Sequence, residues 1–70
     1  MPKLYSSRHI IKILESRGFL FTSQKGSHVK FRKYGIKTLT VIVPARKKEI
    51  PLGTFCSILR QSSLEDIDFS

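Results

Sequence analysis

The chain has 70 residues, which is enough for one small domain over residues 1–70 and leaves no room for a second. Its hydrophobic fraction of 40% is normal for a globular fold and too high for a disordered tail. The 13 Lys and Arg outnumber the 5 Asp and Glu, so the formal net charge is +8. Such a field attracts polyanions, and we expect a nucleic acid, although composition does not distinguish RNA from DNA.

Two further features exclude other classes of protein. No apolar run approaches the roughly 20 residues needed to span a bilayer, and residues 1–6 lack the apolar centre of a signal peptide, so we expect a cytoplasmic protein. Cys56 is the single cysteine and has no partner for an internal disulfide. Together with His9 and His28 it forms no recognisable metal-binding set, so we expect no metal and no cofactor.

The first predicted element is an amphipathic helix over residues 7–17. Ser6 suits its N-cap, and Gly18 can take the left-handed conformation that ends a helix. The apolar residues at helical spacing on one face are Ile10, Ile13 and Leu14. His9 lies beside this face, and we interpret it as a structural residue.

Three short strands are expected next, at residues 19–23, 28–33 and 38–43. Glycine-containing turns at residues 24–27 and 34–37 connect them, and a proline follows the third strand. Short connections of this kind favour an antiparallel meander.

Alternation along these strands separates an apolar face from a polar one. The apolar face carries Val29, Phe31, Leu39, Val41 and Val43. The polar face carries His28, Lys30, Arg32, Thr38 and Thr40. Because an exposed apolar sheet face would aggregate, we expect helices to cover it and the polar face to stay open to solvent.

A basic loop and a second helix complete the predicted fold. The loop contains Arg46, Lys47 and Lys48, and the helix covers residues 52–61 after Pro51. A final short turn is expected to pack back through Leu64, Ile67 and Phe69. The order is α-β-β-β-α, an α+β fold with both helices on one face of a three-stranded antiparallel sheet.

The candidate functional residue is His28. A titratable imidazole on a basic strand face suggests chemistry on nucleic acid, whereas the plainer interpretation is an inert surface histidine. The candidate nucleic-acid-binding residues around it are Lys25, Ser27, Lys30, Arg32, Arg46, Lys47 and Lys48.

Four segments of the chain resemble a known family in their order and spacing. They are ILESRGF (13–19), KGSH (25–28), VIVP (41–44) and EIPLGTFCSILRQ (49–61). This pattern is similar to that of the HicA, or YcfA-like, toxins of HicA–HicB toxin–antitoxin pairs. The resemblance implies a fold like that of a double-stranded-RNA-binding domain, in agreement with the element order above.

The resemblance also implies a function. HicA proteins are endoribonucleases that cleave mRNA, and the histidine of their Gly-Ser-His motif is catalytic, which assigns this role to His28. A HicB-type antitoxin is expected to neutralise the toxin by covering that histidine. The free toxin is expected to be a monomer, and DNA binding belongs to the antitoxin.

The chain departs from the family pattern at three positions. Arg46 stands where many relatives have a second histidine, Cys56 where Lys or Arg is usual, and Ser63 where glycine is common after the second helix. Two alternatives remain open from the residues alone: a non-catalytic RNA-binding module, and a module whose basic face binds an acidic protein.

Overall fold

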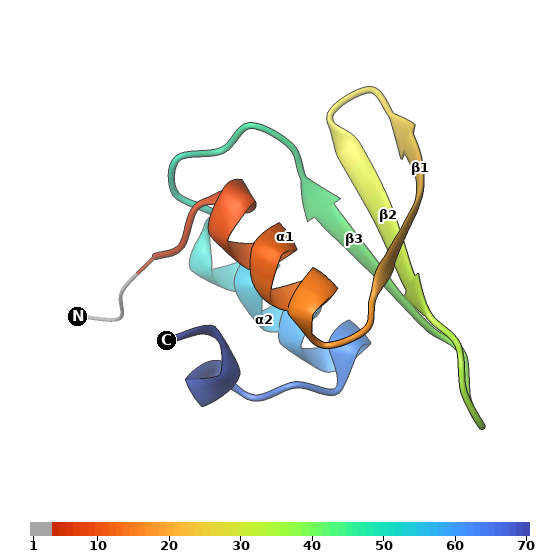
Figure 1. Cartoon of the computed structure of the whole chain (residues 1–70). Coiled ribbons are helices and arrows are strands. Elements are labelled where there is room, and N and C mark those ends of the chain that lie inside the picture. Colours follow the sequence, from red (N-terminus) through yellow and green to blue (C-terminus); the bar gives the residue numbers. More distant parts are fainter. Residues whose placement is uncertain (1–3) are drawn as a thin grey trace.

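The computed structural model describes residues 4–70 (Figure 1). Its elements are α1 (Ser7–Ser16), β1 (Leu20–Lys25), β2 (His28–Lys33), β3 (Leu39–Pro44), α2 (Leu52–Ser62) and a short 3₁₀ helix, η1 (Asp66–Phe69). The strands form one antiparallel sheet in the order β1-β2-β3, and both helices lie on the same side of it (Figure 1). This confirms the predicted α+β fold of the double-stranded-RNA-binding-domain type.

Helix α1 begins and ends where its capping residues predict. The Ser6 side chain accepts a hydrogen bond from the His9 backbone N–H at 3.1 Å. Gly18 has a φ of 92°, and the following Phe19 N–H donates to the Leu14 carbonyl at 3.0 Å. Phe19 is therefore part of the helix ending, with its ring buried in the core, and β1 starts one residue later than predicted.

The turn between β1 and β2 is tighter than predicted. Lys25 pairs directly with His28, so the turn consists of Gly26 and Ser27 alone and β1 extends to Lys25. Gly26 has a φ of 58°, the conformation that a two-residue hairpin with glycine at its first turn position requires. A Cβ atom at Gly26 would have no neighbour within 4 Å, so space is open around this turn.

The core lies between the sheet and the two helices. Its buried members include the predicted residues Val29, Phe31, Val41, Val43, Ile10, Leu14, Phe55 and Ile58. Tyr5 and Ile50, which the sequence did not single out, are also buried, and the Ile50 N–H donates to the Tyr5 carbonyl at 2.8 Å. This bond joins the segment before α1 to the segment before α2 within one core.

Strand β1 contains an irregularity between Phe21 and Ser23. Phe21 is paired with Phe31, whereas Ser23 is paired with Lys30, so Thr22 has no partner in the register. Paired residues point to the same side of a sheet. The bulge therefore places Phe21 on the helix side while Ser23 lies on the open side with Lys30.

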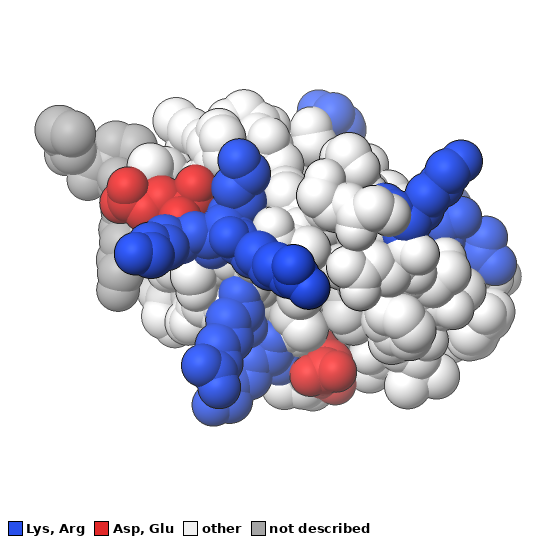
Figure 2. All heavy atoms as spheres, turned by 90° about the horizontal axis from the view of Figure 1, so that it is seen from above, with Lys and Arg blue, Asp and Glu red and all other residues white. Residues whose placement is uncertain are grey.

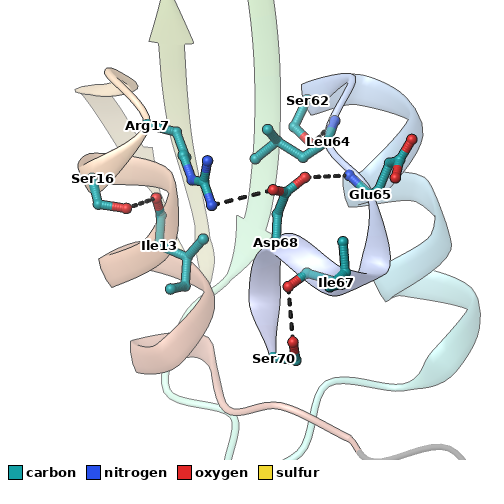
Figure 3. Close-up of polar contacts among 9 residues, drawn as sticks. All are labelled: Ile13, Ser16, Arg17, Ser62, Leu64, Glu65, Ile67, Asp68 and Ser70. Carbon is teal, nitrogen blue, oxygen red and sulfur yellow. Dashed lines mark hydrogen bonds and ion pairs between the residues drawn. The ribbon is translucent and has the colours of Figure 1, made fainter.

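The C-terminal segment packs against the end of α1 (Figure 3). Asp68 pairs with Arg17 at 3.2 Å and also accepts a hydrogen bond from the Glu65 N–H at 2.8 Å. Phe69 is buried, with its ring edge-on to Phe55. The prediction that Ile67 also packs back is wrong, since its side chain is 74% exposed. A 3₁₀ helix turns through three residues, so a residue two positions before Phe69 faces away from the core.

Candidate functional site

His28 is the first residue of the central strand of the sheet. It pairs with Lys25 in β1 and with Pro44 in β3, and its side chain is exposed. Because paired and alternate residues share a face, Lys25, Lys30 and Arg32 lie on the same side of the sheet as the imidazole. The structure thus brings four of the predicted site residues together.

The cations on this face are not neutralised by the part of the chain that the structure describes. The ion pair found among residues 4–70 joins Arg17 and Asp68, and it lies on the other side of the fold at the end of α1. The open face around His28 therefore presents positive charge that is available to an anion.

Ser27 ties the turn before His28 to the loop that follows β3. Its carbonyl accepts a hydrogen bond from the Ala45 N–H at 2.6 Å. The next residue, Arg46, has a φ of 58°, which is uncommon for a residue with a side chain. Arg46 stands where the resembled family often has a second histidine. It directly follows Ala45, whose N–H contacts the turn before His28.

Helix α1 holds the other end of this loop. The buried Ser7 hydroxyl donates to the Pro44 carbonyl at 2.5 Å and accepts from the Lys47 N–H at 2.9 Å. The Ser7 N–H also donates to the Lys47 carbonyl at 2.9 Å. Three hydrogen bonds thus fix the loop against the start of α1.

The loop cations do not share a surface with Lys30 and Arg32. Arg46, Lys47 and Lys48 line an open groove of about 940 Å³ between α1 and the β1–β2 hairpin. Figure 2 shows the largest group of blue side chains over α1 and the loop after β3. The predicted RNA-binding residues therefore form two groups, a strand group with His28 and a loop group on the helix side.

Sequence reasoning missed three residues that complete this groove. Arg8 and Lys12 line it from α1, and Phe21 lines it from β1. Arg8 and Lys12 could have been grouped from the sequence, because residues four apart in a helix lie on one face. Phe21 could not be placed from the sequence because the bulge at Thr22 changes the strand's alternation.

The His9 side chain makes two contacts that hold the fold together. Its ring stacks on Tyr5 with centroids 4.9 Å apart, and its Nε2 lies 2.5 Å from the Phe69 carbonyl oxygen. A carbonyl can only accept, so Nε2 carries a hydrogen and donates it. His9 therefore ties α1 to the C-terminal segment, in line with its interpretation as a structural residue.

The described residues contain no other obvious reactive centre. Within residues 4–70, no three His, Cys, Asp or Glu side chains gather closely enough to hold a metal ion. Cys56 is an exposed free thiol on α2. No helix of the described chain has the length and apolar character needed to cross a membrane.

Comparison with known proteins supports the resemblance seen in the sequence. Among curated proteins, none matches the chain. The family described as "HicA toxin of bacterial toxin-antitoxin" matches residues 7–64, which include both helices, the whole sheet and His28. The chain therefore belongs to the HicA toxin family, whose members are the toxins of bacterial toxin–antitoxin systems and so act with an antitoxin partner.

Proposed function

We propose that this toxin is an endoribonuclease that cleaves mRNA without a metal ion and uses His28 for proton transfer. The observation that carries the proposal is the position of His28. Its exposed imidazole shares a sheet face with Lys25, Lys30 and Arg32, and none of these three forms an ion pair with a described carboxylate.

RNA supplies its own nucleophile, so this chemistry needs few protein groups. The 2′ oxygen attacks the adjacent phosphorus, its proton passes to a base, and the bond from phosphorus to the 5′ oxygen breaks as that oxygen takes up a proton. The products are a 2′,3′-cyclic phosphate and a 5′-hydroxyl. A histidine suits such proton transfers near neutral pH, and acid–base help of this kind is typically worth ~10²–10⁴-fold in rate.

The neighbouring cations would stabilise the charge that develops on the phosphoryl oxygens. Lys30 and Arg32 follow His28 at spacings of two and four on the same strand face, so they line the path of a phosphate backbone that passes the imidazole. Ser27, directly before His28, is the residue that we assign to orienting the substrate.

The antitoxin partner implied by the family is proposed to be a HicB-type protein that covers His28. An imidazole that is exposed on an open sheet face is accessible to a masking surface as well as to RNA. Masking of this face would block both the proton transfer and the phosphate contacts.

The test compares the parent chain with His28→Ala and His9→Gln on a labelled mRNA in excess EDTA. The parent and His9→Gln should cleave, because Gln can still donate to the Phe69 carbonyl, whereas His28→Ala should bind RNA without cleaving it. Cleavage that survives in His28→Ala overturns the assignment of the histidine. RNA binding without cleavage by the folded parent would instead favour the non-catalytic RNA-binding module.

A further inference from the structure

We propose that the groove between α1 and the β1–β2 hairpin binds a single-stranded segment of the RNA substrate, with a base stacked on Phe21 and phosphates on the basic rim. The inference rests on the proposed function for its choice of RNA. It adds a binding site on the side of the sheet opposite His28.

The floor of the groove is apolar and contains an accessible aromatic ring. Phe21 is 58% exposed, and its ring meets Phe31 edge-on at a centroid distance of 6.2 Å and an interplanar angle of 82°. Ile11 and Val29 complete the floor beside the two rings. Phe31 anchors Phe21 from one side and leaves ring surface open to the groove, which is the arrangement that a stacking base needs.

The bulge in β1 is what directs this ring into the groove. In a regular strand Phe21 and Ser23 would share a face, because alternate residues do. The register shift instead pairs Phe21 with Phe31 on the helix side and Ser23 with Lys30 on the open side. Bulges commonly re-aim a side chain near a functional site, and this one leaves a large apolar ring exposed that a regular β1 would have turned to the other face.

The rim of the groove is strongly positive. Its cations are Arg8, Lys12, Arg46, Lys47 and Lys48, against Glu15 as the one acid that lines it. None of the five cations forms an ion pair with a described carboxylate. A polyanion therefore complements the rim, and a polyanion that also carries flat apolar rings complements the floor.

Single-stranded RNA fits this combination better than the alternatives. A duplex keeps its bases stacked inside and offers mainly phosphates and 2′-hydroxyls, so it would leave Phe21 unused. An acidic protein segment matches the rim, but its side chains would have to supply an aromatic or aliphatic anchor for the floor. An unpaired nucleotide carries both the charge and the ring in one repeating unit.

The groove is continuous with the turn that carries His28. Gln24 and Val29 line the groove and are paired with each other, and the next pair towards the turn is Lys25 with His28. Successive residues in a strand are about 3.3 Å apart, so an RNA strand leaving the groove reaches His28 by passing around the turn. The empty space around Gly26 gives it room to do so.

Binding is measured in the His28→Ala background, so that the RNA stays intact. The probes are a short unstructured fluorescent RNA, an abasic strand of the same length and an RNA duplex. Phe21→Ala should weaken binding of the unstructured RNA by about 5- to 150-fold, the effect expected for loss of one stacked base. The abasic strand and the duplex should bind equally with and without the substitution. Tyr34→Ala, which removes an exposed aromatic at the opposite hairpin, is the matched control and should change nothing.

Phe21→Leu protects the test against misfolding, because it keeps an apolar contact with Phe31 but has no ring to stack on. It should bind RNA as weakly as Phe21→Ala while retaining the thermal unfolding midpoint of its parent. If Phe21→Ala leaves RNA affinity unchanged while the unsubstituted chain cleaves mRNA, the groove assignment is overturned and the proposed function stands.

The reverse combination of results distinguishes the RNA-binding groove from the proposed nuclease activity as well. Weaker RNA binding by Phe21→Ala, with no cleavage by the unsubstituted chain, supports the groove and contradicts the nuclease. If Phe21→Ala weakens binding of the abasic strand as much as binding of the unstructured RNA, base stacking on Phe21 is overturned. The groove would then be a general polyanion-binding surface.

Discussion

Ser7 and Lys47 exchange two hydrogen bonds across the interface of α1 and the basic loop, although they are 40 residues apart in the chain. The Ser7 N–H donates to the Lys47 carbonyl and the Lys47 N–H donates to the Ser7 hydroxyl, each at 2.9 Å. The same hydroxyl donates to the Pro44 carbonyl. One small buried side chain thus joins the first turn of α1 to the loop that carries Arg46.

Ser7→Ala should lower the free energy of unfolding by about 1–3 kcal/mol, because it leaves the Lys47 N–H and the Pro44 carbonyl without their partner. Urea unfolding followed by circular dichroism measures this. Ser70→Ala is the control, since its exposed hydroxyl donates to the Ile67 carbonyl and its removal should cost no more than about 0.5 kcal/mol. Equal effects of the two variants would contradict the anchoring role of Ser7.

Gly26→Ala should destabilise the protein by about 1–2 kcal/mol, since a side chain at a φ of 58° is strained even where space is open. Gly53→Ala makes the same chemical change within α2. There φ is not positive and an added Cβ would meet no neighbouring atom within 4 Å, so this variant should be more stable by up to about 1 kcal/mol. Thermal unfolding of both variants tests whether the first lowers the stability of the fold and the second raises it. A stabilised Gly26→Ala would show that the turn does not need glycine.

Ser63→Gly should stabilise the protein by up to about 1 kcal/mol. Ser63 caps the end of α2 with a φ of 59° and a ψ of 22°, the left-handed conformation that glycine adopts without strain. This geometry explains why glycine is expected at this position from the family resemblance. A midpoint of thermal unfolding that falls in the variant would show that the serine side chain contributes more than the strain costs.

A substrate with a bridging sulfur at the 5′ position tests how His28 acts within the proposed mechanism. A thiolate leaves without being protonated, so such a substrate needs a general base but no general acid. If His28 is the base, we expect His28→Ala to be equally inactive on the oxygen and sulfur substrates, as judged by single-turnover rates. Recovery of cleavage on the sulfur substrate would reassign His28 as the general acid.

The loop cations should contribute to RNA affinity through charge alone. The double variant Lys47→Ala and Lys48→Ala should reduce the slope of log affinity against log salt concentration by about 0.7 for each phosphate that the two lysines neutralise, whatever the RNA sequence. Lys37→Ala, in the β2–β3 turn at the opposite end of the sheet from the β1–β2 turn, is the control and should leave the slope unchanged. An unchanged slope in the double variant would show that these lysines do not bind the RNA backbone.

The sequence was sufficient to predict the sheet face of His28. Val29 and Phe31 alternate with it over a strand whose observed bounds match the prediction, and both are buried while His28 is exposed. Capping chemistry likewise located both ends of α1, because Ser6 and Gly18 act through local backbone geometry. Such features depend on neighbours in the chain and are therefore predictable from it.

The groove could not be predicted, because it depends on contacts between distant segments. The bulge at Thr22 is set by pairing with β2, and it alone decides that Phe21 faces α1. The direction of the basic loop depends on Ser7, whose partners lie 37 and 40 residues away. Side-chain periodicity carries no information about either, so the sequence could not show that the loop cations line a groove beside α1.

The central place of β2 has a consequence for how such a toxin is restrained. His28 is paired on one side with Lys25 and on the other with Pro44, so its backbone cannot swing away without breaking both ladders. The geometry proposed for cleavage is therefore complete as soon as the sheet has folded. Restraint of the proposed activity would therefore have to come from a partner that occupies this face, since the strand itself offers no inactive arrangement.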